Sequence, residues 1–463
     1  MDSEVCQKAI ALYKKHFNEE PETAVMAPGR VNLIGEHTDY NDGFVCPLAI
    51  HLATCIVGKK LDSNKCIVIS GALGEDMKAE FNGDDSLAPS EKVEWYEYVK
   101  GVVAQYIKEF NLPQVGFQVA CFSNVPLGGG LSSSASLEVA IGTFIEEIFG
   151  LEHDGKKRAL LSQEAEHEYA HVPCGIMDQF ISSCGEKDHA LLIDCRSKET
   201  ELVPLTNPDV SIVVTNSNCK HSLTGSEYPE RVAACKKAVE IIKGKYPEVI
   251  ALRDVTIEML DEVKDQLDEV TYRRALHSIT EDIRTKKCVE CLKNNDYEGA
   301  GQYLYQSHES LKDNYEVTTE ELDILVELAK QVPGVFGARM TGGGFGGCTI
   351  TLVKKSAEEA LINQLKKGYK EATGKDCTIF ATRPSQGAHV ISLTSTPAPA
   401  AVAPKTEVAP KCENCTVCKC SCCPFKWLSK VSKNIFGCRF ALPVTLLVAA
   451  GWTAYYFISK KKN

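Results

Sequence analysis

The chain has 463 residues and a net charge of −11, and 44% of its residues are hydrophobic. This length and composition are typical of a soluble globular protein with roughly two or three domains. The acidic balance argues against nucleic acid as a partner, because nucleic-acid-binding domains carry an excess of basic residues.

Residues 1–17 mix apolar and charged positions in the pattern of an amphipathic helix. A secretion signal needs an uninterrupted apolar stretch instead, so we expect no export signal here. The cysteines of the first 393 residues are scattered singly through apolar stretches. We therefore expect reduced, mostly buried thiols and a cytoplasmic catalytic region.

A dense polar cluster follows in the run from Pro28 to Tyr40. It combines Arg30 with two carboxylates and an imidazole, supplied by Glu36, His37 and Asp39. Structural charges usually occur singly or in pairs one helical turn apart. A ligand with many hydroxyl groups, by contrast, needs several donors and acceptors close together. The run therefore predicts a pocket for such a ligand, with a polar capping loop as the alternative.

A glycine- and serine-rich run extends from Pro126 to Ser136. Residues 115–122 before it alternate like a strand, and the apolar residues of 137–148 after it recur at helical spacing. Glycines allow close backbone approach, and the start of a helix favours an anion. We expect a strand, a phosphate-binding loop and a serine-capped helix, although an ordinary tight turn is the alternative. The run lacks the Gly-Lys-Ser/Thr ending of a P-loop.

A third run, from Met340 to Cys348, is again rich in glycine and lies between two strand-like stretches, 335–339 and 349–353. So many glycines cannot serve side-chain packing. The run predicts a backbone surface against a substrate or against the phosphate loop, and a flexible turn is the alternative.

In this order and at these separations, the three runs resemble the motifs of the GHMP kinases, and the first has its galactokinase form. The resemblance extends over about residues 4–393 and includes the segments 174–180 and 216–229. It implies an α+β fold with two domains, 1–200 and 201–393, and an active site in the cleft between them. It also implies a monomer that uses ATP and Mg²⁺ to phosphorylate galactose at its C1 hydroxyl, giving galactose 1-phosphate and ADP.

Two alternatives to this activity are an N-acetylgalactosamine kinase and a sensor that binds galactose and ATP without catalysis. The sequence Glu-His-Thr-Asp-Tyr-Asn of residues 36–41 has the galactose form. Related sensors lack a Ser-Ala pair that is present here as Ser134 and Ala135. Both observations favour a galactose-phosphorylating enzyme.

The resemblance also implies roles for individual residues. Asp178 matches the catalytic carboxylate that would accept the C1 hydroxyl proton, and Arg30 matches the cation beside it; a buried ion pair is the alternative. The residues that match sugar contacts are Arg30, Glu36, His37, Asp39, Gly175, Asp178 and Tyr228. Those that match the nucleotide site are Gly128, Gly129, Gly130, Leu131, Ser132, Ser133, Ser134, Trp95 and Tyr98. Ser134 and Glu166 match Mg²⁺ ligands, and Trp95 and Tyr98 are expected on one helical face near the adenine.

The composition changes after residue 393. Residues 394–411 are rich in Pro and Ala and predict a linker, and residues 412–438 are basic and rich in cysteine. Residues 440–458 carry no charge, and as a helix they would cross roughly one bilayer core. We expect acylated cysteines and a C-terminal membrane anchor that holds the kinase on the cytosolic face of an intracellular membrane. A disordered extension is one alternative, and a Zn²⁺ or Cu(I) site in the cysteine cluster is another.

Overall fold

The computed structural model describes residues 4–71, 76–219 and 227–393. The predicted linker, cysteine-rich segment and membrane anchor all lie outside these described residues. Within them, the structure contains no helix of sufficient length and apolarity to span a bilayer. None of the fourteen cysteines in this part of the chain forms a disulfide, and most are buried, as predicted.

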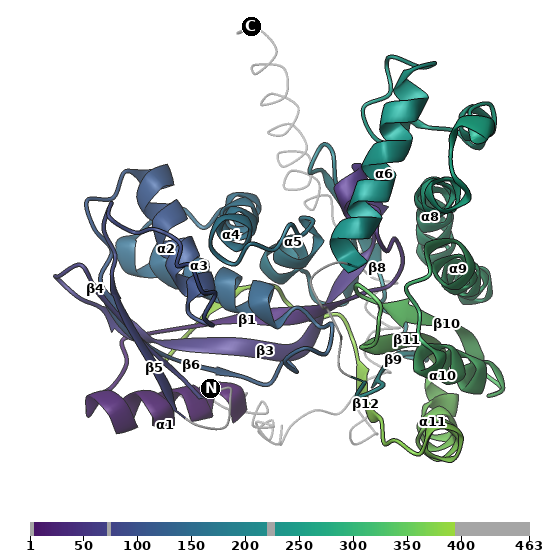
Figure 1. Cartoon of the computed structure of the whole chain (residues 1–463). Helices are drawn as coiled ribbons and strands as arrows, with labels where there is room; N and C mark the ends of the chain where they lie inside the picture. The colour runs from purple at the N-terminus through teal and green to yellow at the C-terminus, as the bar shows by residue number, and fades with distance from the viewer. Residues whose placement is uncertain (1–3, 72–75, 220–226, 394–463) are drawn as a thin grey trace, which may run out of the picture. The chain divides into compact units, whose positions relative to one another are not determined.

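The first half of the chain is built around a six-stranded sheet with the strand order β13-β1-β3-β6-β4-β5. Its strands are β1 (Thr23–Asn32), β3 (Pro47–Lys60), β4 (Lys65–Ser70), β5 (Met77–Asn82), β6 (Phe117–Ser123) and β13 (His389–Ile391). Helix α1 (Glu4–Phe17) covers one face (Figure 1). The other face carries α2 (Glu97–Phe110), α3 (Ser133–Phe149), α4 (Gly155–Tyr169) and α5 (Met177–Cys184).

The alternation of β6 explains why both faces of this sheet are covered. Val119 and Cys121 are buried in the core that α2 and α3 help to form. Ala120 and Phe122 point the other way, into the core beneath α1. Successive side chains of a strand face opposite sides of the sheet, so the consecutive apolar residues 119–122 require helices on both faces.

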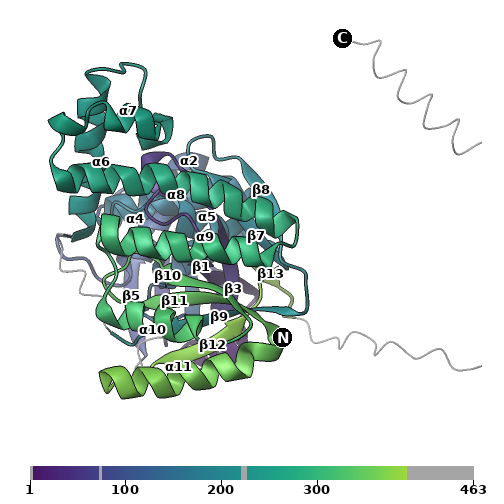
Figure 2. The ribbon, with the colours of Figure 1, turned by 90° about the vertical axis from the view of Figure 1, so that its right-hand side faces the viewer.

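The second half contains a four-stranded antiparallel sheet with the order β10-β11-β9-β12. Its strands are β9 (Val210–Asn216), β10 (Val335–Thr341), β11 (Cys348–Lys354) and β12 (Thr378–Thr382). The helices are α6 (Glu227–Lys243), α7 (Ile257–Asp261), α8 (Glu269–Lys293), α9 (Tyr297–Ser310), α10 (Glu320–Lys330) and α11 (Glu358–Thr373). Figure 2 shows α8 and α9 running side by side over this half. A small sheet of β2 (Phe44–Val45), β7 (His189–Asp194) and β8 (Thr200–Pro204) completes the described fold.

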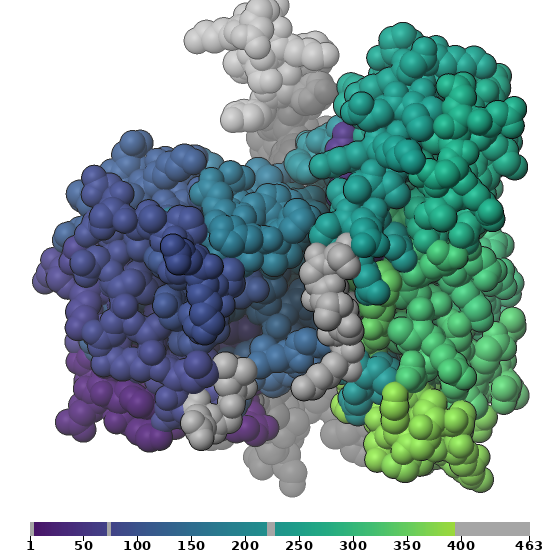
Figure 3. Space-filling view, in the orientation of Figure 1, coloured from purple at the N-terminus to yellow at the C-terminus, as the bar shows by residue number. Residues whose placement is uncertain are grey.

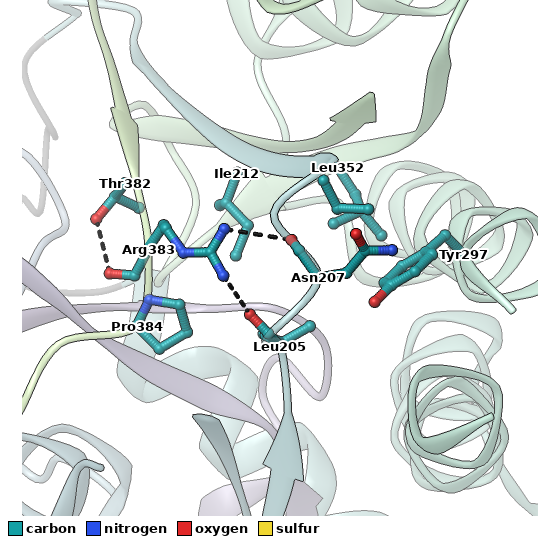
Figure 4. Close-up of a pocket in the computed structure, with 9 residues that line it drawn as sticks. Leu205, Asn207, Ile212, Tyr297, Leu352, Thr382, Arg383 and Pro384 are labelled. Carbon is teal, nitrogen blue, oxygen red and sulfur yellow. Dashed lines mark hydrogen bonds between the residues drawn. The ribbon is translucent and has the colours of Figure 1, made fainter. Parts of the chain in front are cut away.

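The chain crosses between sheets at residues 205–209, from β8 of the small sheet to β9, and at residues 383–388, from β12 to β13 of the six-stranded sheet. Arg383 ties the crossings together, because its guanidinium donates to the main-chain oxygens of Leu205 at 2.9 Å and Asn207 at 3.2 Å (Figure 4). After the second crossing, β13 pairs with β1, where Ala24 lies opposite Ile391. The predicted α+β fold is therefore confirmed, and the division into domains 1–200 and 201–393 stays a prediction.

In the space-filling view, the purple-to-blue residues and the teal-to-green residues form two lobes that meet along a hollowed seam (Figure 3). Hydrogen bonds join the three glycine-containing runs to one another. The first run spans the end of β1 and the loop after it, the second joins β6 to α3, and the third joins β10 to β11. The fold thus brings together segments that lie about 100 to 300 residues apart in the sequence.

Candidate active site

A cavity of about 430 Å³ lies where the three runs meet. It is lined by Arg30, Glu36, His37, Asp39, Gly128, Gly130, Leu131, Ser132, Ser133, Ser134, Glu166, Gly175, Asp178 and Tyr228, all of them predicted site residues. Other lining residues were not predicted individually from the sequence, among them Tyr40, His171, Val172, Pro173 and Met177. Gly342 and Gly343, which also line the cavity, belong to the third run, for which the sequence predicted a backbone surface against a substrate or against the phosphate loop.

Arg30 and Asp178, which both line the cavity, form an ion pair. Arg30 sits beside a bulge in β1, and Asp178 lies in the first turn of α5. The guanidinium donates two parallel hydrogen bonds to the carboxylate, from Nε to Oδ1 at 2.7 Å and from Nη2 to Oδ2 at 2.8 Å. The third nitrogen, Nη1, donates to the main-chain oxygen of Gly130 at 2.6 Å. Arg30 therefore fixes the carboxylate and the glycine loop in one geometry.

The phosphate-loop candidate departs from the prediction in one respect. Ser132 precedes α3 with a φ of +60° and makes no side-chain cap, so the expected serine-capped helix is wrong. Its hydroxyl donates to Asp178 Oδ2 instead. The loop itself is open: a Cβ added at Gly128 would meet no atom within 4 Å. An uncapped helix start beside an open glycine loop is suited to bind phosphate.

The third run lies against both of the others. The main-chain N–H of Gly342 donates to Glu36 Oε1 at 2.7 Å, and the oxygen of Gly343 contacts His37 Nε2 at 3.2 Å. Cys348 Sγ, at the end of the run, donates to the oxygen of Gly129 at 3.0 Å. The sequence predicted that this run forms a backbone surface against the phosphate loop. Its contacts with Glu36 and His37 of the first run were not predicted.

The carboxylates of the first run are enclosed and electrostatically perturbed. Burial raises the pKa of Glu36, and the nearby guanidinium groups of Arg339 and Arg30 oppose that shift. Burial, with Asp178 close by, raises the pKa of Asp39 to about 7. Asp39 also lies directly against Gly175, where an added Cβ would come within 1.7 Å of its Oδ2. Carboxylates in such an enclosed site suit the recognition of neutral hydroxyl groups.

His37 and Tyr228 form an aromatic wall of the cavity. Their ring centroids are 6.0 Å apart, and Tyr228 packs edge-on against Tyr40 at 5.5 Å. Burial lowers the pKa of His37 to about 3, so its imidazole is neutral at physiological pH. Both ring nitrogens have protein partners, since Nδ1 also lies 2.8 Å from the hydroxyl of Tyr40.

The two predicted metal ligands come together on one side of the cavity. Ser134 and Glu166 both line the cavity, and the Ser134 hydroxyl lies close enough to the carboxylate to favour its ionised form. Burial and the nearby Asp178 raise the pKa of Glu166 to about 7. Gln179 Nε2 donates to Glu166 Oε2 at 2.6 Å and to Glu138 Oε2 at 3.0 Å. An oxygen-only donor set of this kind fits Mg²⁺.

Glu138 was not predicted as part of the site. It is fully buried in α3, and its Oε1 has no hydrogen-bond partner among the described residues. Burial, with Glu166 beside it, raises its pKa well above the ordinary value. Its position among the apolar residues of the predicted helix could have indicated a role in the site, because a buried carboxylate needs a partner.

Trp95 and Tyr98 do not share a helical face as expected, because Trp95 lies in the turn before α2 begins at Glu97. Neither is among the residues that line the cavity. Trp95 packs against the core beneath α2 and α3. Burial raises the pKa of Tyr98 to about 12, with Glu166 and Glu138 nearby. Their contact with adenine stays a prediction.

Comparison with known proteins identifies the family. Three family profiles match: the galactokinase galactose-binding signature at residues 11–60, the GHMP kinases N terminal domain at 97–186 and the GHMP kinases C terminal at 288–371. The fold is also similar to that of a mevalonate kinase, with a TM-score of 0.55 at 20% identity over 78% of this chain and 98% of the other. Fold and site together therefore define the GHMP kinase class.

Closer relatives narrow this class. The chain is 45% identical to the galactokinase of Homo sapiens over 84% of its length and 98% of that protein, and 44% identical to that of Bos taurus over 84% and 97%. It resembles the crystal structure of Lactococcus lactis galactokinase complexed with galactose, with a TM-score of 0.78 at 34% identity over 82% of this chain and 98% of the other. The chain belongs to the galactokinase family.

Proposed function

We infer that the protein is an ATP-dependent galactokinase, which transfers the γ-phosphate of ATP to the C1 hydroxyl of galactose and releases galactose 1-phosphate and ADP. Mg²⁺ accompanies the nucleotide. The observation that carries this function is the bidentate Arg30–Asp178 pair, which joins an open phosphate-type loop to an enclosed cavity lined by carboxylates. Phosphoryl transfer needs this combination, because its catalysis consists mostly of positioning and charge stabilisation.

We propose that Asp178 orients the attacking hydroxyl and receives its proton. The carboxylate already accepts two hydrogen bonds from Arg30 and one from Ser132. A carboxylate has about four acceptor positions, so roughly one remains for the C1 hydroxyl. Arg30 then serves two purposes: it holds Asp178 in place and stabilises negative charge on the transferred group.

We propose that Glu36, Asp39, Gly175 and Tyr228 form the galactose subsite, with His37 beside them. Short acceptors in a fixed frame distinguish epimers, since an epimer leaves a buried polar group unpaired. The nucleotide is proposed to bind along residues 128–134, with Trp95 and Tyr98 towards its adenine. Ser134 and Glu166 would hold Mg²⁺, which neutralises phosphate charge when bound.

Release of ADP, measured with galactose, N-acetylgalactosamine and glucose as acceptors, tests the function. We expect turnover with galactose, and ³¹P NMR should show a sugar 1-phosphate. Turnover with N-acetylgalactosamine alone would identify the second kinase activity instead. Binding of galactose and ATP without turnover would identify a sensor.

We also propose the domain division 1–200 and 201–393, a monomeric state, and a membrane anchor at 440–458 preceded by acylated cysteines in 412–438. The support for the anchor is the uncharged length of that segment and its basic flanks. Fractionation tests it: the full chain should pellet with membranes and resist carbonate extraction, while a chain ending at Leu393 should be soluble and fully active. A full-length protein found in the supernatant would contradict the anchor.

A further inference from the structure

A chain of hydrogen bonds begins at His37 and Tyr40, which line the cavity, and links the two halves of the fold. His37 Nδ1 lies 2.8 Å from the hydroxyl of Tyr40, which lies 2.8 Å from the hydroxyl of Tyr315. The Tyr315 hydroxyl in turn lies 3.3 Å from Cys235 Sγ. Tyr315 ends the helical turn after α9, and Cys235 belongs to α6. Tyr315 and Cys235 are fully buried, and Tyr40 packs against the same apolar core.

The contact of His37 with Gly343 determines which group is the donor in each of these hydrogen bonds. The main-chain oxygen of Gly343 can only accept, so His37 Nε2 carries the proton. Because the imidazole is neutral, Nδ1 is then an acceptor, and the Tyr40 hydroxyl donates to it. Tyr40 has its oxygen free to accept from the hydroxyl of Tyr315. One tautomer of His37 is thereby selected.

Hydrogen bonds also fix the main-chain conformation around His37. Its φ is +63°, which is uncommon for a residue with a Cβ. Asn41 Nδ2 donates to the main-chain oxygen of His37 at 3.0 Å, and His277 Nε2 donates to that of Glu36 at 3.1 Å. Side chains from both halves of the chain therefore hold the loop at the point where it turns into the cavity. A conformation of this kind persists only when surrounding contacts enforce it.

We propose that Tyr40 and Tyr315 are positioning residues of the sugar site, which lock His37 in place and thereby set the positions of the flanking Glu36 and Asp39. The proposal rests on the galactose-binding function proposed above. Because both imidazole nitrogens already have protein partners, His37 acts on the sugar through the conformation of its loop. Tyr315 comes from the second half of the fold, so it couples that half to a subsite built mainly from the first.

The consequence for binding follows from the order of the chain. Tyr40→Phe removes the donor to His37 Nδ1 directly and leaves a buried acceptor unpaired, which is the costlier loss. Tyr315→Phe removes the hydrogen bond that orients the Tyr40 hydroxyl and the contact with Cys235 Sγ, but it leaves His37 Nδ1 with its donor. The first change should therefore disturb galactose binding more than the second.

Steady-state kinetics on the full-length protein test the proposal, with Tyr106→Phe as the matched control. Tyr106 is as buried as Tyr315, and its hydroxyl donates to Glu146 at 2.6 Å, away from the cavity. We expect the KM for galactose to rise about 10-fold in Tyr40→Phe and about 3-fold in Tyr315→Phe, with kcat and the KM for ATP unchanged. The double variant should resemble Tyr40→Phe alone, because both changes act through one chain. The control should lose stability only.

An unchanged galactose KM in folded Tyr40→Phe, or equal changes in the control, would overturn the positioning role. NMR of the ¹⁵N-histidine-labelled wild type gives an answer that does not depend on the variants. Its His37 signal, assigned through His37→Gln, should show the Nε2–H tautomer, and the Nδ1–H tautomer would refute the proposal. If the wild type does not phosphorylate galactose at all, the proposed function fails, and the tautomer measurement still tests the hydrogen-bond chain.

Discussion

A single methyl group at position 175 should damage galactose binding and leave ATP binding intact. The Cβ of Gly175→Ala would lie 1.7 Å from Asp39 Oδ2 and 2.1 Å from its Cγ. Real Cβ contacts are almost never shorter than about 3 Å, so the Asp39 carboxylate must move by more than an ångström. A misplacement of this size at a reacting or binding group can cost about 100-fold. We therefore expect kcat/KM for galactose to fall by about 100-fold, mostly through KM.

The assay is initial-rate kinetics with galactose and ATP varied separately, together with calorimetry of ATP binding. Gly244→Ala is the control, because its new Cβ would meet only a main-chain oxygen of Ile241, at 3.1 Å, outside the cavity. The mechanism is tested more sharply in an Asp39→Ala background. There the clash is largely removed, so Gly175→Ala should add little to the effect of Asp39→Ala. An equal loss in both backgrounds, or a KM within about threefold of wild type, would refute the steric argument.

Three further outcomes follow from the site. Asp39, with a pKa near 7, is protonated at low pH and becomes an ionised acceptor above that value, so kcat/KM for galactose should rise about 10-fold from pH 6 to pH 8. Asp39→Asn should give a flatter profile, and an unchanged rise would assign the titration to another group such as Glu166, whose pKa burial also raises to about 7. Asp178→Ala should lower kcat by about 100-fold or more, and Arg30→Ala by more still if positioning dominates; turnover within a few-fold of wild type in Asp178→Ala would contradict its role. Glu166→Gln should weaken binding of Mn²⁺ with ATP, measured by electron paramagnetic resonance, by about 10-fold, and unchanged metal binding would remove Glu166 from the ligand set.

Much of the site could be predicted because its residues lie in short runs with their own chemistry. The glycine loop and the helix after it were predicted from the local sequence pattern, and this helix is α3, which begins at Ser133 in the structure. The partners of those residues could not be found in the same way. Ser132 reads as a helix cap, yet its hydroxyl bonds to Asp178, which is 46 residues further along the chain. The local sequence indicates which conformation a residue favours, whereas a tertiary contact determines the hydrogen-bond partner of Ser132.

Two other features could not be predicted from the local sequence. Trp95 and Tyr98 fit a helical spacing, but α2 begins only at Glu97, and helix starts are poorly determined by apolar periodicity alone. The sequence around Tyr315 does not indicate a role for this residue in the site. Its proposed role rests on the hydrogen bond with Tyr40, which is 275 residues away in the sequence. Buried tyrosines usually indicate packing, and only the partner of the hydroxyl distinguishes a functional one.

The pairing of β13 with β1 has a consequence for how the protein is made. Ala24 leaves the ribosome long before its partner Ile391 has been synthesised. Until Ile391 has been synthesised, that edge of β1 has no strand beside it, and an open edge can pair with another chain. The first sheet is therefore completed only after the second has been translated. Biogenesis of the two halves is linked, and a nascent chain stalled before His389 should depend on chaperones.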